Sequence, residues 1–268
     1  MSASRALRAG ALALLVGTGG GPGPAGLEAQ EMDPGPEGLP PLAGEGLPGL
    51  LVPAPRPLTL APADRERRLT AAVDSLVRHA MALPPAGRRP AAARADSLAA
   101  VLLAFRPDAA DAHHWRAVTA GLLAEASGKA ERIRLGRLAY ERATTAVELD
   151  PAHAGAHHVL GRVHLGLLRL SWIARFFAGR MGLGPLLDTA SWDVAEHHLR
   201  RAAELAPREP SFHLELGTLL AERGRPEEAR PHLRRVLELS APRGLEGDLR
   251  ERARRLLEGL GGDDRGNS

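Results

Sequence analysis

Histidine is the residue type with the clearest capacity for chemistry in this chain, which contains eleven of them. Three pairs are adjacent in sequence: His113–His114, His157–His158 and His197–His198. Imidazole nitrogens bind metal ions, but neighbours on a helix point about 100° apart and do not chelate one ion well. His113, His157 and His213 also share one offset, six residues after a proline. We therefore interpret them as structural residues and predict no metal site and no cofactor.

Catalytic motifs are not found. The chain has no cysteine, which excludes thiol catalysis, disulfides and a lipid anchor on an N-terminal cysteine. It has no GxSxG sequence, and its glycine runs lack the Lys-Ser or Lys-Thr of a phosphate-binding loop. The formal charge of +3 is small for a nucleic-acid binder of this length. We predict that the protein is not an enzyme, has no catalytic residues and does not bind nucleic acid.

The stretch from 211 to 239 predicts two short helices folded against each other. Apolar residues at helical spacing mark the first helix, and Gly224 with Pro226 separates it from the second. Ala229, Leu233 and Val236 form the buried face of the second helix. A single helix pair cannot bury both of its faces, so this one requires stacked copies beside it.

Upstream copies appear when the chain is aligned on the residues that close each second helix, at 107, 151, 207 and 241. Counting back from them gives the same small–apolar pattern four times: Ala95, Ala99, Leu102; Ala139, Ala143, Ala146; Ala195, Leu199, Ala202; Ala229, Leu233, Val236. Counting forward ten residues gives Ala117, Gly161 and Gly217. The closing residues lie 44, 56 and 34 residues apart, and 34 is the period of the tetratricopeptide repeat.

The predicted fold is an all-α, tetratricopeptide-like solenoid at 63–260. Four antiparallel helix pairs are expected at 64–83 with 91–105, 110–126 with 130–149, 154–170 with 191–205, and within 211–239. A capping helix follows at 248–260, with polar residues on its outer face. Breaks are expected near 84–90, 127–129 and 171–190.

The two ends of the chain have different compositions from the repeats. Arg5 and Arg8 precede a short apolar run, which predicts a signal peptide at 1–29 and export to the periplasm, with an uncleaved membrane anchor as the alternative. Nine prolines at 30–62 predict a disordered tether. The alternative is that the apolar residues 50–52 dock on the solenoid. The polar tail at 261–268 is expected to be disordered.

The sequence resembles the regulator of microtubule dynamics family between residues 110 and 240. The resemblance rests on HHVLGRVH at 157–164, LSWIARFFAG at 170–179 and TASWDVAEHHLRRAAELAP at 189–207, with HHWRAV and ERATTAVELDP upstream. Eukaryotic members are linked to microtubules and organelle membranes. An exported bacterial relative has no microtubules to meet, so the resemblance implies the fold and leaves the role open.

A protein or peptide partner is expected on the first helices of the pairs, which line the concave side of a solenoid. Arg162, His114, His158 and Thr218 are the predicted groove residues. Arg162 is a permanent cation that can bind a carboxylate, so we expect an acidic peptide segment as the partner. The alternative is that Arg162 pairs with an acid of a neighbouring helix, such as Glu204 or Glu215.

The insertion at 171–188 concentrates aromatic residues, with Trp172, Phe176 and Phe177 beside Arg175 and Arg180. We expect these aromatics to fill the wedge between adjacent repeats. The alternative is that they contact a membrane surface or a partner, which would make the protein a membrane-surface tether.

Overall fold

The computed structural model describes residues 61–240 and 245–262, and throughout these ranges the chain forms helices without strands. The predicted signal peptide, nearly all of the proline-rich linker and most of the C-terminal tail lie outside the described residues. The all-α prediction is confirmed for the part of the chain that folds into repeats.

The first two pairs are α2 (Pro62–Ala82) with α3 (Pro85–Phe105), and α4 (Ala110–Glu125) with α5 (Lys129–Leu149). The next two are α6 (Ala154–Leu168) with α9 (Trp192–Leu205), and α10 (Pro210–Glu222) with α11 (Pro226–Glu238). The last helix, α12 (Glu246–Gly262), packs on α10 and α11 as the expected cap.

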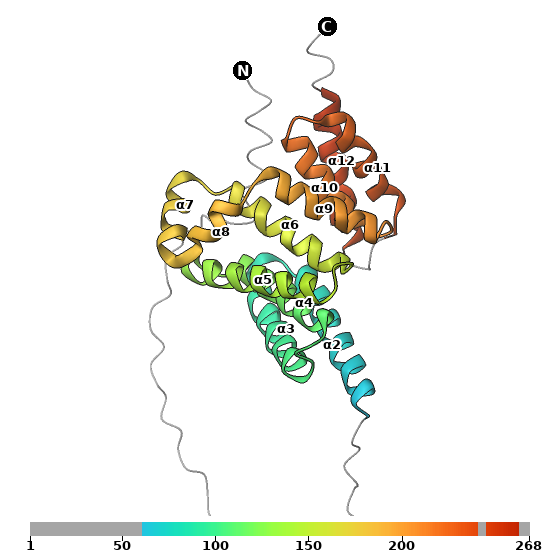
Figure 1. Ribbon diagram of the computed structural model, residues 1–268. Helices are drawn as coiled ribbons and strands as arrows, with labels where there is room; N and C mark the ends of the chain where they lie inside the picture. Colours follow the sequence, from blue (N-terminus) through green and yellow to red (C-terminus); the bar gives the residue numbers. More distant parts are fainter. Residues whose placement is uncertain (1–60, 241–244, 263–268) are drawn as a thin grey trace, which may run out of the picture. The chain divides into compact units, whose positions relative to one another are not determined.

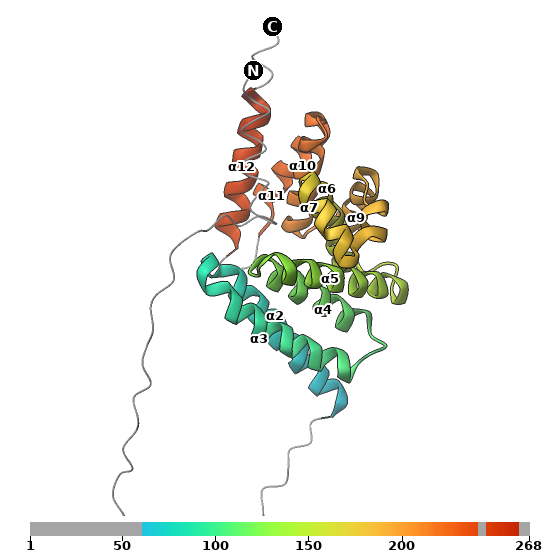
Figure 2. The ribbon, with the colours of Figure 1, turned by 90° about the vertical axis from the view of Figure 1, so that its left-hand side faces the viewer.

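Each helix packs mainly on the other helix of its pair and on the helices of the adjacent pairs, as Figures 1 and 2 show. The first helices of successive pairs also touch one another, α4 against α6 and α6 against α10. This is the solenoid predicted from the repeat spacing. Its consequence for function is that side chains of α4, α6 and α10 share one face.

Alanine and leucine fill the core at the predicted offsets. All twelve residues of the four-fold small–apolar pattern are at most 1% exposed. Gly161 and Gly217 lie where helices cross. A Cβ at Gly161 would come within 2.6 Å of Leu199, and one at Gly217 within 2.8 Å of Leu233. Both distances are shorter than real contacts, so these crossings require glycine.

The predicted break at 84–90 is wrong for most of its length, because α3 begins at Pro85 and contains Pro90. Proline is tolerated in the first turn of a helix, where its missing N–H would have no partner. Pro90, farther in, removes only one hydrogen bond from the α3 ladder. The break is therefore limited to the residues just before Pro85.

The insertion after α6 is helical and does not form the expected break. It comprises α7 (Trp172–Ala178), the π-helix η2 (Gly179–Leu183) and α8 (Gly184–Thr189). Gly182 has a φ of 87°, and Arg137 of α5 donates a hydrogen bond of 3.1 Å to the neighbouring Met181 carbonyl. Among the described residues, no helix has the length and apolar character needed to cross a membrane.

Candidate functional site

The predicted groove residues lie on the first helices of three successive pairs: His114 on α4, His158 and Arg162 on α6, and Thr218 on α10. All four are partly buried. The Thr218 hydroxyl donates to the Leu214 carbonyl of its own helix at 2.7 Å. Thr218 therefore marks the position equivalent to Arg162 and does not link helices.

Arg162 forms an ion pair with a residue that the sequence analysis did not name. Its Nη2 donates to Oε1 of Glu125 on α4 at 2.8 Å. Glu204 is not its partner, and Glu215 acts on Arg162 through its charge. Although burial opposes it, the two carboxylates raise the pKa of Arg162, which remains cationic. The guanidinium thus has a fixed orientation, with 36% of the side chain still exposed.

The Glu125–Arg162 pair belongs to a row of alternating charges that runs from α4 across α6 and α10 to α12. Glu215 of α10 is buried and lies 3.6 Å from Arg252 of α12. Burial would raise the pKa of Glu215, but the charges of Arg162 and Arg252 outweigh it and lower that pKa. The row is balanced in charge, so Arg162 is compensated before any partner arrives.

A second ion pair continues this face at the far end of the same helices. Arg169, which caps the C-terminal end of α6, donates to both carboxylate oxygens of Glu222 on α10, at 2.7 and 3.1 Å. Both side chains are largely buried. Burial raises the pKa of Glu222 even though Arg169 opposes the shift. This bidentate pair joins α6 to α10 and leaves little of either residue for a partner.

His114 packs between α4 and α6. The centroid of its ring is 4.7 Å from the centroid of the His153 ring. A Cβ on Gly155 would come within 2.5 Å of the Cε1 atom of His114. Burial, aided by the charge of His153 when protonated, lowers the pKa of His114 to about 3. His114 is therefore neutral at neutral pH.

His158 links α6 to α10 by ring contact, with its centroid 4.5 Å from that of Phe212. Burial, followed by the charge of Arg162, lowers its pKa to about 3. Its Nε2 is shielded from solvent and has no hydrogen-bond partner. His158 is thus a neutral imidazole beside Arg162, and one of its two ring nitrogens makes no hydrogen bond.

The three histidines at the common offset make the same hydrogen bond. The Nε2 atoms of His113, His157 and His213 contact the carbonyls of Pro107, Pro151 and Pro207 at 2.9, 3.1 and 3.1 Å. Each ring thereby ties the start of a first helix to the turn before it. The structural interpretation of these residues is confirmed.

Two of these histidines also contact the second helix of their own pair. His157 Nδ1 lies 2.9 Å from His198 Nδ1, and His213 Nδ1 lies 3.1 Å from His232 Nδ1. Burial, with the neighbouring His157, lowers the pKa of His198 to about 4. Within the described residues, no group of three or more histidines and carboxylates is arranged to hold a metal ion.

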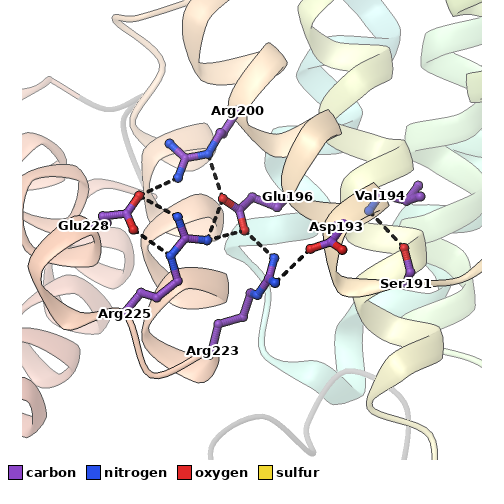
Figure 3. Close-up of polar contacts among 8 residues, drawn as sticks. All are labelled: Ser191, Asp193, Val194, Glu196, Arg200, Arg223, Arg225 and Glu228. Atoms are coloured by element: carbon purple, nitrogen blue, oxygen red, sulfur yellow. Dashed lines mark hydrogen bonds and ion pairs between the residues drawn. The ribbon is translucent and has the colours of Figure 1, made fainter.

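Sequence reasoning missed the charge cluster around Glu196, which Figure 3 shows. Glu196 of α9 accepts hydrogen bonds from Arg200 at 2.8 Å, Arg223 at 2.5 Å and Arg225 at 2.7 Å. Burial alone would raise the pKa of Glu196, but Arg200 and Arg225 lower it. Arg225 and Arg200 also bind Glu228 of α11. The cluster fastens α9 to the turn between α10 and α11.

The first helix pair also has an acid at the position of Glu196, and this recurrence could have revealed the cluster from the sequence. Asp96 of α3, eleven residues before the closing proline as Glu196 is, accepts a hydrogen bond of 3.0 Å from Thr119 and pairs with Arg116, both on α4. The first and third pairs therefore share an acid at this position, which binds arginine or threonine of the next pair.

The prediction that the aromatic residues of the insertion fill the wedge between adjacent repeats is wrong for Phe176 and Phe177. Phe176 and Phe177 are each 57% exposed, and the side chain of Trp172 lies outside the described ones. The space against α5 and α6 is filled by Ala178, Leu183, Leu186 and Leu187. Smaller aliphatic side chains fit between helices already in close contact, and the phenylalanines point outward.

A model of the family of regulator of microtubule dynamics proteins 1-3 matches residues 85–261, more than half of the 268-residue chain. The chain belongs to this family. The match runs from α3 to α12, so it contains the whole alternating row and the insertion. It confirms the resemblance that was drawn from the sequence motifs.

Two relatives show how far the similarity extends. Regulator of microtubule dynamics protein 3 of Rattus norvegicus is 35% identical over 100 residues, and that of Bos taurus is 36% identical over 98. The matches cover 37% of this chain in both cases, and 21% and 20% of the relatives. The chain thus spans about a fifth of the length of these family members.

Solved structures of low sequence identity are also similar. The Thermus thermophilus tetratricopeptide protein TTC0263 gives a TM-score of 0.49 at 22% identity, with 75% of this chain and 84% of that one covered. A MamA double mutant gives 0.36 at 20%, with coverages of 66% and 84%. The solenoid fold is established here by the chain's own helix pairs and by its family.

Proposed function

We propose that this family member is an exported scaffold that holds an acidic segment of a partner protein on the face formed by α4, α6 and α10. The observation that carries the proposal is the state of Arg162. It is an oriented cation on the middle helix of the three, and part of its side chain is open to solvent.

The chemistry of this face suits a carboxylate. A guanidinium has five N–H donors, and a single hydrogen bond, to Glu125, is found for Arg162. The remaining donors are available to a partner. His114 and His158 are neutral because their pKa values lie near 3, so they add no positive charge beside Arg162. A carboxylate arriving here would share or replace Glu125 as the partner of Arg162.

The carboxylates of Glu125 and Glu215 oppose an acidic partner, and this sets the expected strength of binding. A partner's carboxylate must weaken the existing ion pair between Arg162 and Glu125, so the affinity of one carboxylate contact is modest. A solenoid face is an extended surface on which several repeats contact a partner. The proposal therefore places one anchor at Arg162 and assigns the remaining affinity to contacts along α4 and α10.

Replacement of Arg162 by alanine is expected to weaken peptide binding by roughly tenfold or more, because a hydrogen bond to a charged group contributes about 1.5–3 kcal/mol. The probe is the peptide most enriched from a random displayed library on the wild-type protein, and its Kd is measured at equal folded fraction. Arg201→Ala, on the second helix α9, removes an exposed arginine elsewhere and serves as control. An unchanged Kd for Arg162→Ala, or a basic consensus peptide, would exclude the anchor.

Export is supported by the sequence pattern at the N-terminus, namely two arginines followed by an apolar run. We propose a cleaved leader at 1–29 and a tether at 30–62 that separates the repeats from the point of export. Protein isolated from its host is then expected to begin at or near Gly26 or Gln30. N-terminal sequencing that finds Met1 or Ser2 in the cytosol would contradict export.

The family relatives are named for the regulation of microtubule dynamics. Because this chain matches about a fifth of their length, we extend their fold to it and base the proposed role on the α4–α6–α10 face. Protein binding on that face requires no microtubule.

A further inference from the structure

The insertion presents a second surface, distinct from the proposed partner-binding face. Ile173, Phe176, Phe177, Arg180 and Met181 recur at the spacing of one helical face. The four apolar members are 49%, 57%, 57% and 45% exposed. They account for most of the large apolar side chains that are exposed among the described residues. An apolar cluster of this kind on a soluble fold indicates an interaction site.

The opposite side of the insertion is firmly held, so the outward direction of this face is fixed by the fold. Leu183, Leu186 and Leu187 are buried against residues of α5 and α6. Arg175 donates to the Leu167 carbonyl at the end of α6 at 3.2 Å, and Arg137 donates to the Met181 carbonyl. Figure 1 shows α7 and α8 at the edge of the helical array, beside α5 and α6.

The charges near this surface indicate which kind of partner it binds. The chain contains no aspartate or glutamate from Pro151 to Leu187. Arg180 is exposed and lies over the Phe176 ring, 5.9 Å from its centroid. Apolar side chains with arginines and without acids favour the surface of an anionic bilayer, where rings enter the headgroup layer and cations meet lipid phosphates. A second copy of the chain is disfavoured, because two such faces would bring their Arg180 side chains together.

We propose that the face of α7 and η2 docks on an anionic lipid bilayer, with Phe176 and Phe177 inserted at the headgroup level and Arg180 at the lipid phosphates. The repeats would then be held at a membrane surface while the α4–α6–α10 face remains a separate binding surface. The proposal does not depend on partner capture by Arg162, since the two surfaces share no residue.

Because the chain has no cysteine, Phe177→Cys places a single thiol on this face for an environment-sensitive fluorophore. The full-length protein is mixed with vesicles of phosphatidylethanolamine and phosphatidylglycerol, or of phosphatidylcholine alone. We expect a blue shift at position 177 with the anionic vesicles and none for a label at Leu149→Cys, an exposed site on α5. The labels report locally, so vesicle binding by residues 1–29 does not obscure the result.

A second measurement is the partition to the same anionic vesicles of unlabelled protein that begins at Gln30, so that residues 1–29 do not contribute to the binding. Phe176→Ser with Phe177→Ser is expected to weaken it at least about tenfold, because two phenyl rings lose their burial. Val101→Ser with Leu149→Ser removes two apolar side chains of similar exposure and should leave it unchanged. The proposal is overturned if the label at 177 stays in water on bound protein, if it shifts equally with phosphatidylcholine, or if it shifts with protein concentration in the absence of lipid.

Discussion

Acidification from neutral to about pH 5 is expected to reduce the free energy of unfolding by roughly 4 kcal/mol through His114 and His158 alone. Their pKa values are lowered to about 3 in the folded chain, against about 6.5 in an unfolded one. The unfolded state therefore binds more protons than the folded state between these values. Stability is fully present above about pH 6.5 and falls progressively as the pH drops toward the folded pKa values.

Other titratable side chains also change the free energy of unfolding as the pH falls. His198, with a pKa lowered to about 4, adds to it in the same range. Glu196 and Glu215 have lowered pKa values, so their contributions are lost only when the pH falls below the usual carboxyl range. Glu222 acts in the opposite direction, because its pKa is raised in the folded chain. A net decline between neutral pH and about pH 5 thus reports on histidine.

Urea unfolding at a series of pH values measures this effect. The double variant His114→Gln, His158→Gln should lose about 4 kcal/mol of the pH dependence between neutral and about pH 5. The part that is due to the other histidines with lowered pKa values, His157, His164, His198 and His232, should remain. His197→Gln, at an exposed histidine beside His198, should retain the pH dependence of the wild type. A double variant whose stability falls with pH as steeply as that of the wild type would show that these rings are not the buried neutral groups described here.

Gly217→Leu is expected to destabilise the fold by roughly 1–3 kcal/mol or more, because it overpacks the crossing of α10 and α11. The new Cβ alone would lie 2.8 Å from Leu233, and neither helix can move without disturbing the pairs on each side. Gly161→Leu should behave alike at the crossing of α6 and α9, where the corresponding distance to Leu199 is 2.6 Å.

Gly136→Leu is the matched control, since nothing lies within 4 Å of its Cβ position on α5. It should be neutral or stabilise the protein by up to about 1 kcal/mol through helix propensity. Thermal melting of the three variants decides the matter. Equal melting temperatures for the variants at 217 and 136 would refute the close helix crossing.

The helix pairs could be predicted because each core position repeats. Ala195, Leu199 and Ala202 have counterparts in every pair, and the offset shared by His113, His157 and His213 marks the same turn each time. The start of α3 could not be read in this way. Pro226 and Pro231 of α11 have the same spacing as Pro85 and Pro90, but Pro84 and Pro85 follow each other directly, and a proline can either begin a helix or end one.

The candidate site was predicted less completely, since periodicity groups residues on a face but does not say what the face meets. Phe176 and Phe177 were grouped correctly, yet which side of α7 packs on α5 and α6 depends on the shape left between those helices. Likewise, Glu125 belongs to the preceding pair, 37 residues before Arg162. Choosing it over Glu204 or Glu215 requires the angle between α4 and α6.

Glu125→Gln tests the central claim, that Arg162 on the α4–α6–α10 face receives a partner's carboxylate, most directly. The substitution keeps the size of the side chain and removes the charge that competes for the guanidinium. We measure the Kd of the library-selected acidic peptide for this variant and for the wild type at equal folded fraction. Binding that is several-fold tighter in Glu125→Gln is the result the proposal predicts. Unchanged or weaker binding would contradict the claim, because it would mean that the peptide does not compete with Glu125 for Arg162.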